Sequence, residues 1–249
     1  MRLLIVLLLF ISNVSASDFE REKRWADQTV DAIMDGDALW LEANKHEFLS
    51  IYTEAEEESD KALIVVHGSG IHPNWDQIVK PVRVEMTSRG WNTLSIQMPI
   101  LANDASYQAY AKTYPQVPGR LLAAQKYLIE KGNKTIVIVA HSQGATMSSY
   151  SLSRDQQHVK GYVAIGQSSN QQNPEVNSAL ALKSITIPVL DIYGSEDLPS
   201  VLTTSEKRKQ NGRTNKNYSQ IMIPRANHFF DGMNDVLINA IEEWLKRYF

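Results

Sequence analysis

The feature that most constrains this chain is a β-branched apolar run that ends in a serine flanked by small residues. Residues 136–140 read Ile-Val-Ile-Val-Ala, and His-Ser-Gln-Gly follows at 141–144. The run predicts a buried strand, and the small residues predict a sharp turn into a helix. The spacing matches G-x-S-x-G, an elbow that exposes one serine between a strand and a helix, with Ala140 in place of the first glycine. The alternative is an ordinary strand-to-helix loop in which Ser142 is only an N-cap.

Three other apolar runs also lead into residues suited to nucleophilic catalysis. Each is β-branched and is followed by turn-forming residues, which predicts a strand that ends in an exposed loop. In chain order, residues 62–66 precede His67 and Gly68, residues 187–193 precede Glu196 and Asp197, and residues 220–223 precede His228. All four motifs are therefore expected at the carboxyl ends of strands.

Helical periodicity lies between these runs. Apolar residues recur at helical spacing in residues 19–35, 76–89, 118–131 and 235–248, and residues 38–42 and 47–53 predict two antiparallel strands. Alternating strands and helices predict an α/β fold with a mostly parallel, doubly wound sheet of about eight strands and helices on both faces. No repeat or long linker divides residues 17–249, so we expect a single domain.

Composition excludes several classes of function. The chain has 249 residues, no cysteine and a net charge of −3. The absence of cysteine removes disulfides, thiolate metal sites and a cysteine nucleophile. The charge gives no basic field, so nucleic acid is not an expected partner. Serine chemistry requires no metal and no cofactor, and we expect none.

The N-terminus has the pattern of a secretory signal peptide. Met1 and Arg2 precede an apolar run at 3–11, and small residues at 14–16 offer a cleavage site before Ser17. We expect residues 1–16 to be removed and the chain to be exported to the periplasm or secreted. The apolar run is too short to span a bilayer, so no stable membrane span is expected in the mature form. The alternative is an uncleaved interfacial anchor.

Ser142, His228 and a carboxylate form a candidate catalytic set. A serine hydroxyl needs an adjacent base to take its proton, and imidazole titrates near neutral pH. An acid must then hold the imidazole in one tautomer. Asp197 is the first candidate, with Glu196 and Asp191 as alternatives. For His228 the alternative is an ordinary histidine of the core or surface.

Two backbone N–H groups are candidates for an oxyanion hole. Gln143 follows the candidate nucleophile, and Ser69 follows Gly68 in the loop after residues 62–66. Farther along that loop, His72 and Trp75 are candidates for the pocket mouth, with a plain turn as the alternative.

Other segments receive structural predictions. Residues 100–117 and 167–186 are irregular and polar, and we expect them to form the pocket wall or a small cap, with surface loops as the alternative. We expect His67 to brace its loop and His141 to pack beside the serine, neither acting as a base. The basic run at 206–213 is expected to be a solvated helix end.

Together, the motifs at 67–70, 140–144, 194–197 and 226–229 resemble those of the α/β-hydrolase superfamily, over nearly the whole mature chain. The order serine, acid, histidine is typical of that fold. Residues 66–75 and 90–99 further resemble a group of uncharacterised exported proteobacterial proteins of this superfamily.

The resemblance implies a serine hydrolase with a small-molecule ester or acyl substrate, in the first place a carboxylesterase. A thioesterase or peptidase would use the same residues. The alternative from another class is a non-catalytic, hydrolase-like binding protein of the cell envelope.

Overall fold

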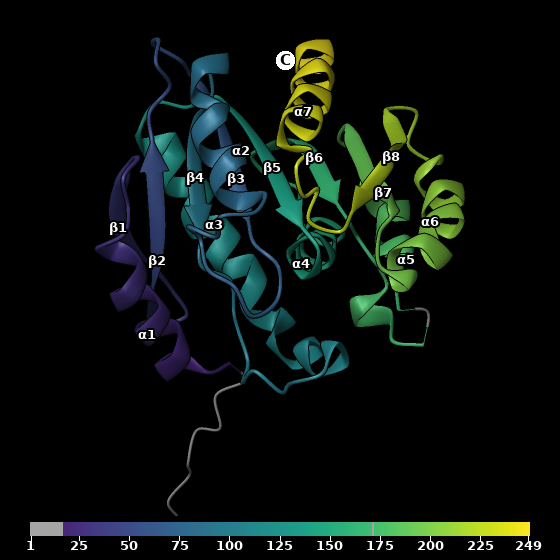
Figure 1. Ribbon diagram of the computed structural model, residues 1–249, viewed down its shortest axis with the longest axis horizontal. Coiled ribbons are helices and arrows are strands. Elements are labelled where there is room, and N and C mark those ends of the chain that lie inside the picture. Colours follow the sequence, from purple (N-terminus) through teal and green to yellow (C-terminus); the bar gives the residue numbers. More distant parts are fainter. Residues whose placement is uncertain (1–16, 171) are drawn as a thin grey trace, which may run out of the picture.

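An eight-stranded sheet forms the centre of the molecule (Figure 1). The computed structural model describes residues 17–170 and 172–249, so the predicted signal peptide lies outside the described residues. The strands are β1 (Asp37–Ala43), β2 (His46–Thr53), β3 (Lys61–Val66), β4 (Asn92–Ile96), β5 (Thr135–His141), β6 (Val159–Ile165), β7 (Val189–Glu196) and β8 (Tyr218–Asn227). Their order is β1-β2-β4-β3-β5-β6-β7-β8, and β2 runs antiparallel to both of its neighbours while the remaining pairs are parallel. The predicted mostly parallel sheet is confirmed.

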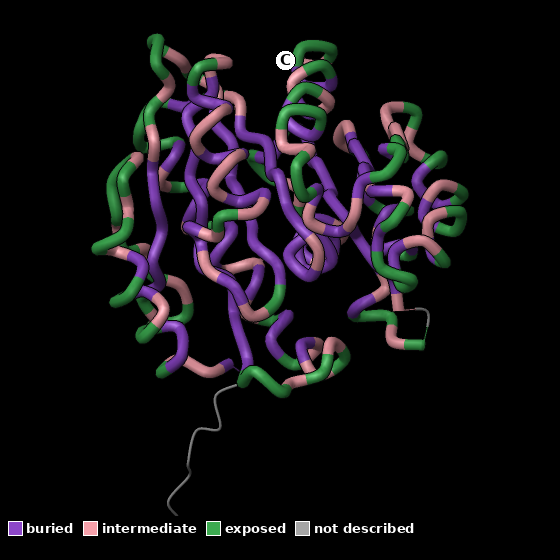
Figure 2. Tube along the Cα trace, in the orientation of Figure 1, coloured by how far each residue is buried: buried purple, intermediate pink, exposed green. Residues whose placement is uncertain are grey.

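Helices cover both faces of this sheet. They are α1 (Phe19–Val30), α2 (Val79–Glu85), α3 (Val117–Glu130), α4 (Gln143–Leu152), α5 (Ser178–Ala181), α6 (Pro199–Gly212) and α7 (Asn234–Tyr248). The segment Tyr107–Gln116 is 3₁₀-helical over ten residues, and short 3₁₀ turns lie at Thr87–Arg89, Pro174–Val176 and Leu182–Ser184. Because side chains of a strand alternate between faces, β3 contributes to two separate cores. Ile64 and Val66 pack with the core that includes α3 and α4, whereas Leu63 and Val65 pack with the core of α2 and α7. Figure 2 shows the buried strands between the partly exposed helices.

Two elements differ from their sequence predictions for identifiable reasons. The helix predicted at 76–89 is reduced to α2 and a 3₁₀ turn, because Ile78 has a positive φ of 60° and Pro81 suits only a first helical turn. Strand β8 continues through Pro224 rather than ending before it. It lies at the edge of the sheet, where a missing N–H leaves no ladder bond unmade.

The N-terminal helix is attached to the body of the protein by buried charge. Glu22 and Arg120 are both nearly inaccessible, and a guanidinium nitrogen of Arg120 lies 2.8 Å from the Glu22 carboxylate. The backbone N–H of Asp18 also donates to Ile100 O at 2.8 Å. These contacts connect α1 to α3 and to the segment after β4. Within the described ranges, no helix is both long and apolar enough to cross a bilayer.

Candidate active site

The reactive-serine candidate occupies a strained turn between β5 and α4. Ser142 has φ 55° and ψ −123°, a conformation that non-glycine residues rarely adopt. The turn brings α4 against the loop after β3, since a Cβ on Gly144 would lie only 2.2 Å from His67 O. Gly144 is therefore required by a close backbone approach, which explains the small residue at this position.

Ser142, His228 and Asp197 form one hydrogen-bonded series. Ser142 Oγ lies 2.8 Å from His228 Nε2, and His228 Nδ1 lies 2.5 Å from Asp197 Oδ1. The three side chains come from the loops after β5, β8 and β7, whose carboxyl ends meet at one edge of the sheet (Figure 1). Of the two alternative acids, Glu196 is exposed and Asp191 is hydrogen-bonded elsewhere, as described below.

The Asp197 carboxylate is held by backbone donors. It is 4% exposed and accepts hydrogen bonds from Leu198 N at 2.7 Å and Gly194 N at 3.3 Å. These bonds fix the orientation of the carboxylate toward His228. Gly166 packs directly on the imidazole, because a Cβ there would lie 3.0 Å from His228 Cε1. The histidine ring is thus fixed at its Nδ1 and on one side.

Two further histidines, His67 and His141, are buried beside the site and hold neighbouring backbone groups. His67 Nδ1 donates to Gly68 O at 2.7 Å, and its Nε2 accepts from Met98 N at 2.8 Å. His141 Nε2 donates to His228 O at 3.0 Å. Burial lowers the pKa of His67 and of His141 to about 3, so both rings are neutral at neutral pH. This agrees with the predicted bracing and packing roles.

The two candidate oxyanion donors belong to α4 and to the loop after β3. Gln143 is the first residue of α4, so its N–H has no partner within the helix. Ser69 lines the same pocket as Ser142. Gly68 permits this approach, since a Cβ on it would lie 3.1 Å from Ser142 Cβ.

A small pocket opens above Ser142. Its volume is about 210 Å³, and Ile71, Val201 and Phe229 give it a largely apolar wall. Both irregular segments contribute a hydroxyl: Tyr107 comes from the first and Ser168 from the second, and Ser168 Oγ donates to Tyr107 Oη at 2.6 Å.

The sequence matches one known protein family over most of its length. The family described as "Protein of unknown function (DUF3530)" matches residues 17–117 and 101–247. The chain belongs to this family. No curated protein sequence matches it.

Solved structures with the same fold include enzymes. Est1E from Butyrivibrio proteoclasticus is 15% identical with a TM-score of 0.67, and the alignment covers 86% of this chain and 99% of that one. The Pyrococcus furiosus esterase Pf2001 is 17% identical, with a TM-score of 0.68 and coverage of 90% and 96%. A dienelactone hydrolase from Anabaena variabilis is 18% identical, with a TM-score of 0.68 and coverage of 86% and 98%. At these identities the likeness establishes the α/β-hydrolase fold, which confirms the predicted fold class.

The structure differs from the sequence prediction at His72 and Trp75, which do not line the pocket of Ser142. They pack in an aromatic cluster with Trp25 of α1, whose ring centroid lies 4.7 Å from that of His72 and 6.1 Å from that of Trp75. Burial in this cluster lowers the pKa of His72 to about 4. The loop turns toward α1 because apolar ring surface is available there.

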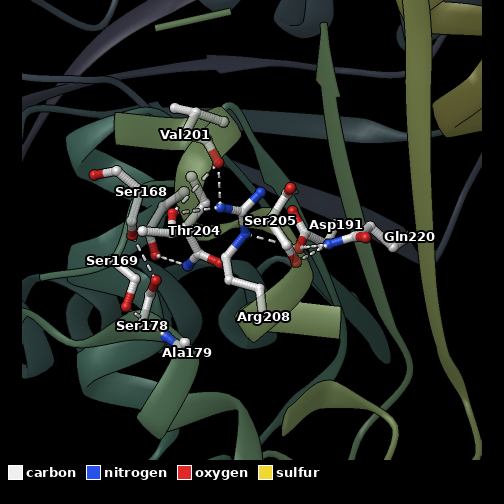
Figure 3. A network of polar contacts seen from close by, with 12 residues as sticks. Ser168, Ser169, Ser178, Ala179, Asp191, Val201, Thr204, Ser205, Arg208 and Gln220 are labelled. Atoms are coloured by element: carbon white, nitrogen blue, oxygen red, sulfur yellow. Dashed lines mark hydrogen bonds and ion pairs between the residues drawn. The ribbon is translucent and has the colours of Figure 1, made fainter. Parts of the chain in front are cut away.

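The basic run at 206–213 is a second difference. Lys207 and Arg213 are exposed, but Arg208 is fully buried. Its Nε lies 2.9 Å from Asp191 Oδ2, and its Nη1 donates to Val201 O at 2.9 Å (Figure 3). Asp191 therefore neutralises Arg208 and is not available to His228.

The sequence carries no signal that distinguishes Tyr107 or Ser168 as a pocket residue within its polar segment, because an aromatic or a serine in a polar loop has no periodic pattern. In the part of the chain that the structure describes, no group of three or more histidine, aspartate or glutamate side chains could hold a metal ion.

Proposed function

We propose that this protein is a serine hydrolase that cleaves small carboxylesters through a Ser142–His228–Asp197 triad. The observation that carries the proposal is the continuous series from Ser142 Oγ through both imidazole nitrogens to the Asp197 carboxylate. A serine that only caps a helix needs neither a contact with an imidazole nor a carboxylate behind that imidazole. The strained backbone at Ser142 supports the same conclusion, since such strain is concentrated at functional sites.

In the first half of the reaction, Ser142 Oγ attacks the ester carbonyl carbon while His228 Nε2 takes the hydroxyl proton. Asp197 keeps Nδ1 protonated and stabilises the imidazolium. The carbonyl oxygen becomes negatively charged and accepts hydrogen bonds from the N–H groups of Ser69 and Gln143. His228 then donates its proton to the departing alkoxide, which leaves as an alcohol.

In the second half, water hydrolyses the acyl-enzyme. His228 Nε2 takes a proton from the water as its oxygen attacks the acyl carbon, and the same oxyanion donors stabilise the second intermediate. Ser142 Oγ recovers the proton when the acid leaves. No step requires a metal or a cofactor.

The size of the pocket supports a small substrate. Its volume of about 210 Å³ is below the roughly 300–1,000 Å³ that is usual for sites of drug-sized ligands. One protein of the same fold is named an esterase and another a dienelactone hydrolase, which favours ester hydrolysis over peptide hydrolysis by analogy of fold.

We also propose that the protein is exported as a single domain beginning near Ser17. The sequence pattern of residues 1–16 supports this, as does a family match that begins at residue 17. Mass spectrometry of the protein recovered from periplasmic and culture fractions would give the N-terminus and the location. Recovery of the full chain with residues 1–16 from the cytoplasm would contradict the proposal.

A fluorophosphonate probe tests the catalytic assignment. The protein from Ser17 onward should be labelled, and Ser142→Ala or His228→Ala should abolish labelling and lower kcat for a 4-nitrophenyl ester on the order of 10⁶-fold. Asp197→Asn should lower kcat about 10⁴-fold. Ser88→Ala, which removes an exposed serine, is the matched control and should behave as wild type.

A folded wild-type protein that is neither labelled nor active would overturn the hydrolase proposal. A binding protein of the cell envelope would then be the remaining candidate.

A further inference from the structure

A second cavity adjoins the pocket of Ser142. Its volume is about 260 Å³, and Ser69 and Tyr107 border both spaces. Its other lining residues include Arg21 of α1, Gly70 and Asn103. The N-terminal helix therefore reaches the same region as the candidate oxyanion loop.

Arg21 is buried in the wall of this cavity with hydrogen-bonding capacity to spare. Arg21 is only 8% exposed to solvent. One terminal nitrogen donates to Leu101 O, and the other donates to Gly70 O at 3.3 Å. A guanidinium has five N–H donors, so three have no partner in the described ranges of the chain. One face of the group lies over the ring of Trp25, at 5.6 Å from its centroid.

No carboxylate neutralises Arg21 within the residues that the structure describes. Asp18 caps α1 by accepting the backbone N–H of Arg21, and Glu22 is paired with Arg120. Glu20 and Asp104 are exposed and form no ion pair with it. None of the described residues that line the cavity is acidic. A buried charge without a counterion is unfavourable unless a ligand supplies one.

We propose that Arg21 and this cavity form a subsite for a carboxylate carried by the acyl part of the substrate. The inference rests on the proposed ester hydrolysis and names its substrate class, an ester of a short dicarboxylic acid. A carboxylate matches the two-pronged donor geometry of a guanidinium. It also matches in charge, because one arginine provides one positive charge, whereas a doubly charged phosphate would require more.

The position of the cavity assigns it to the acyl part. The alcohol must leave beside His228, because His228 gives it a proton. His228 and Phe229 line the pocket of Ser142 but not the cavity of Arg21, which lies beyond Ser69. An acyl chain attached at Ser142 can therefore pass Ser69 and place a terminal carboxylate against Arg21.

Matched esters test the proposal. The 4-nitrophenyl monoester of hexanedioic acid and 4-nitrophenyl hexanoate share a leaving group and a chain length, and they differ in the terminal carboxylate. Wild type should hydrolyse the hexanedioate ester with the higher kcat/KM, after subtraction of the enzyme-free rate. Arg21→Gln should reduce that preference about 10- to 100-fold, mainly through KM. Arg24→Gln removes an exposed arginine of the same helix and should leave the preference unchanged.

A second variant leaves Arg21 and its backbone contacts in place. Asn103→Asp puts a carboxylate into the same cavity at an exposed position, where it should compete for Arg21 and lower the preference for the hexanedioate ester about tenfold. Calorimetric titration with free hexanedioate adds a readout that needs no activity: wild type should bind it, and both variants should bind it at least about tenfold more weakly.

The outcomes separate this inference from the proposed function. Equal rates for the two esters in wild type, or an equal loss for both in Arg21→Gln, would overturn the subsite and leave Arg21 as a tether of the loop. Arg21-dependent binding of hexanedioate without hydrolysis of any ester would support the subsite and contradict the hydrolase. Hexanoate hydrolysis without binding of hexanedioate would do the reverse.

Discussion

Two buried arginines lie behind opposite walls of the candidate active site, and they are neutralised differently. Arg208 holds Val201 O of the α6 wall and is paired with Asp191 at 2.9 Å. Arg21 holds Gly70 O and Leu101 O beside the candidate oxyanion loop, and no acid in the described ranges pairs with it. Arg21 also borders the cavity next to the pocket of Ser142.

The difference distinguishes Arg208, whose charge is compensated within the protein, from Arg21, whose charge is available to a ligand. An arginine does not lose its proton under ordinary conditions, so its charge must be compensated where it is buried. Asp191 compensates Arg208, and Glu22 compensates Arg120. Arg83 is an intermediate case: it has three neutral oxygen acceptors, and burial lowers its pKa to about 10. Arg21 has fewer acceptors than Arg83 and an open space beside it.

Removing the partner of Arg208 should have the largest effect on stability. Asp191→Ala leaves a fully buried cation without its carboxylate, and Tyr218 and Gln220 lose their shared acceptor. The free energy of unfolding in urea should fall by about 3–5 kcal/mol.

The double variant Asp191→Ala/Arg208→Met is the control for this first prediction. It removes both charges, so it should recover much of the lost stability. If Asp191→Ala alone unfolds at the same urea concentration as wild type, the buried charge of Arg208 does not depend on Asp191 for its compensation.

Removing Arg21 should cost less, because no opposite charge is left buried. Arg21→Gln takes away the donors to Gly70 O and Leu101 O, and the free energy of unfolding should fall by about 1–3 kcal/mol. Arg208→Gln leaves the Asp191 carboxylate buried without its partner. If Arg21→Gln lowers the free energy of unfolding as much as Arg208→Gln does, Arg21 has a structural role like that of Arg208. Hexanedioate should raise the unfolding midpoint of wild type but not that of Arg21→Gln.

Histidine shows what a buried basic group does when it can lose its proton. The pKa values of His67 and His141 are about 3 in the folded protein, against 6.5 in the unfolded chain. Between these values the unfolded chain binds more protons, so stability is full above pH 6.5 and falls as the pH drops toward 3. The slope should be about 1.4 kcal/mol per pH unit for each ring.

Urea titrations from pH 7 to pH 4 measure this slope. His67→Asn should reduce it by one histidine's share, whatever its effect on stability at pH 7. A slope that does not change would mean that His67 is protonated in the folded protein or that it is neutral in both states.

Sequence periodicity was sufficient to predict the fold and to place the three residues of the proposed triad at the ends of strands. Strand runs such as residues 159–165, which coincide with β6, alternate with amphipathic helices, and each motif residue follows a strand directly. Parallel strands bring their carboxyl ends together, so Ser142, Asp197 and His228 could be expected to meet.

Contacts between distant loops could not be predicted in the same way. Trp25 turns His72 and Trp75 away from the pocket, and Asp191 draws Arg208 inward from a run that otherwise looks solvated. Arg21 appears in the sequence as one of several charges on a surface helix. Its role follows only from the packing of α1 against Gly70 and Leu101, which depends on the three-dimensional placement of three separate segments.

The smallest effect on stability is expected from an exposed ion pair. Arg154 and Glu175 pair at 3.0 Å, nearly as close as Arg208 and Asp191 at 2.9 Å, but their side chains are 47% and 53% exposed. Water solvates either charge when its partner is removed, and salt screens the pair. Glu175→Ala should therefore change the free energy of unfolding by less than about 1 kcal/mol, because Arg154 keeps its stacking on Tyr150, at 3.6 Å from the ring centroid. A loss as large as that of Asp191→Ala would mean that the pairing distance, rather than burial, determines how much these arginines stabilise the fold. Burial would then give no reason for Arg21 to bind an anion.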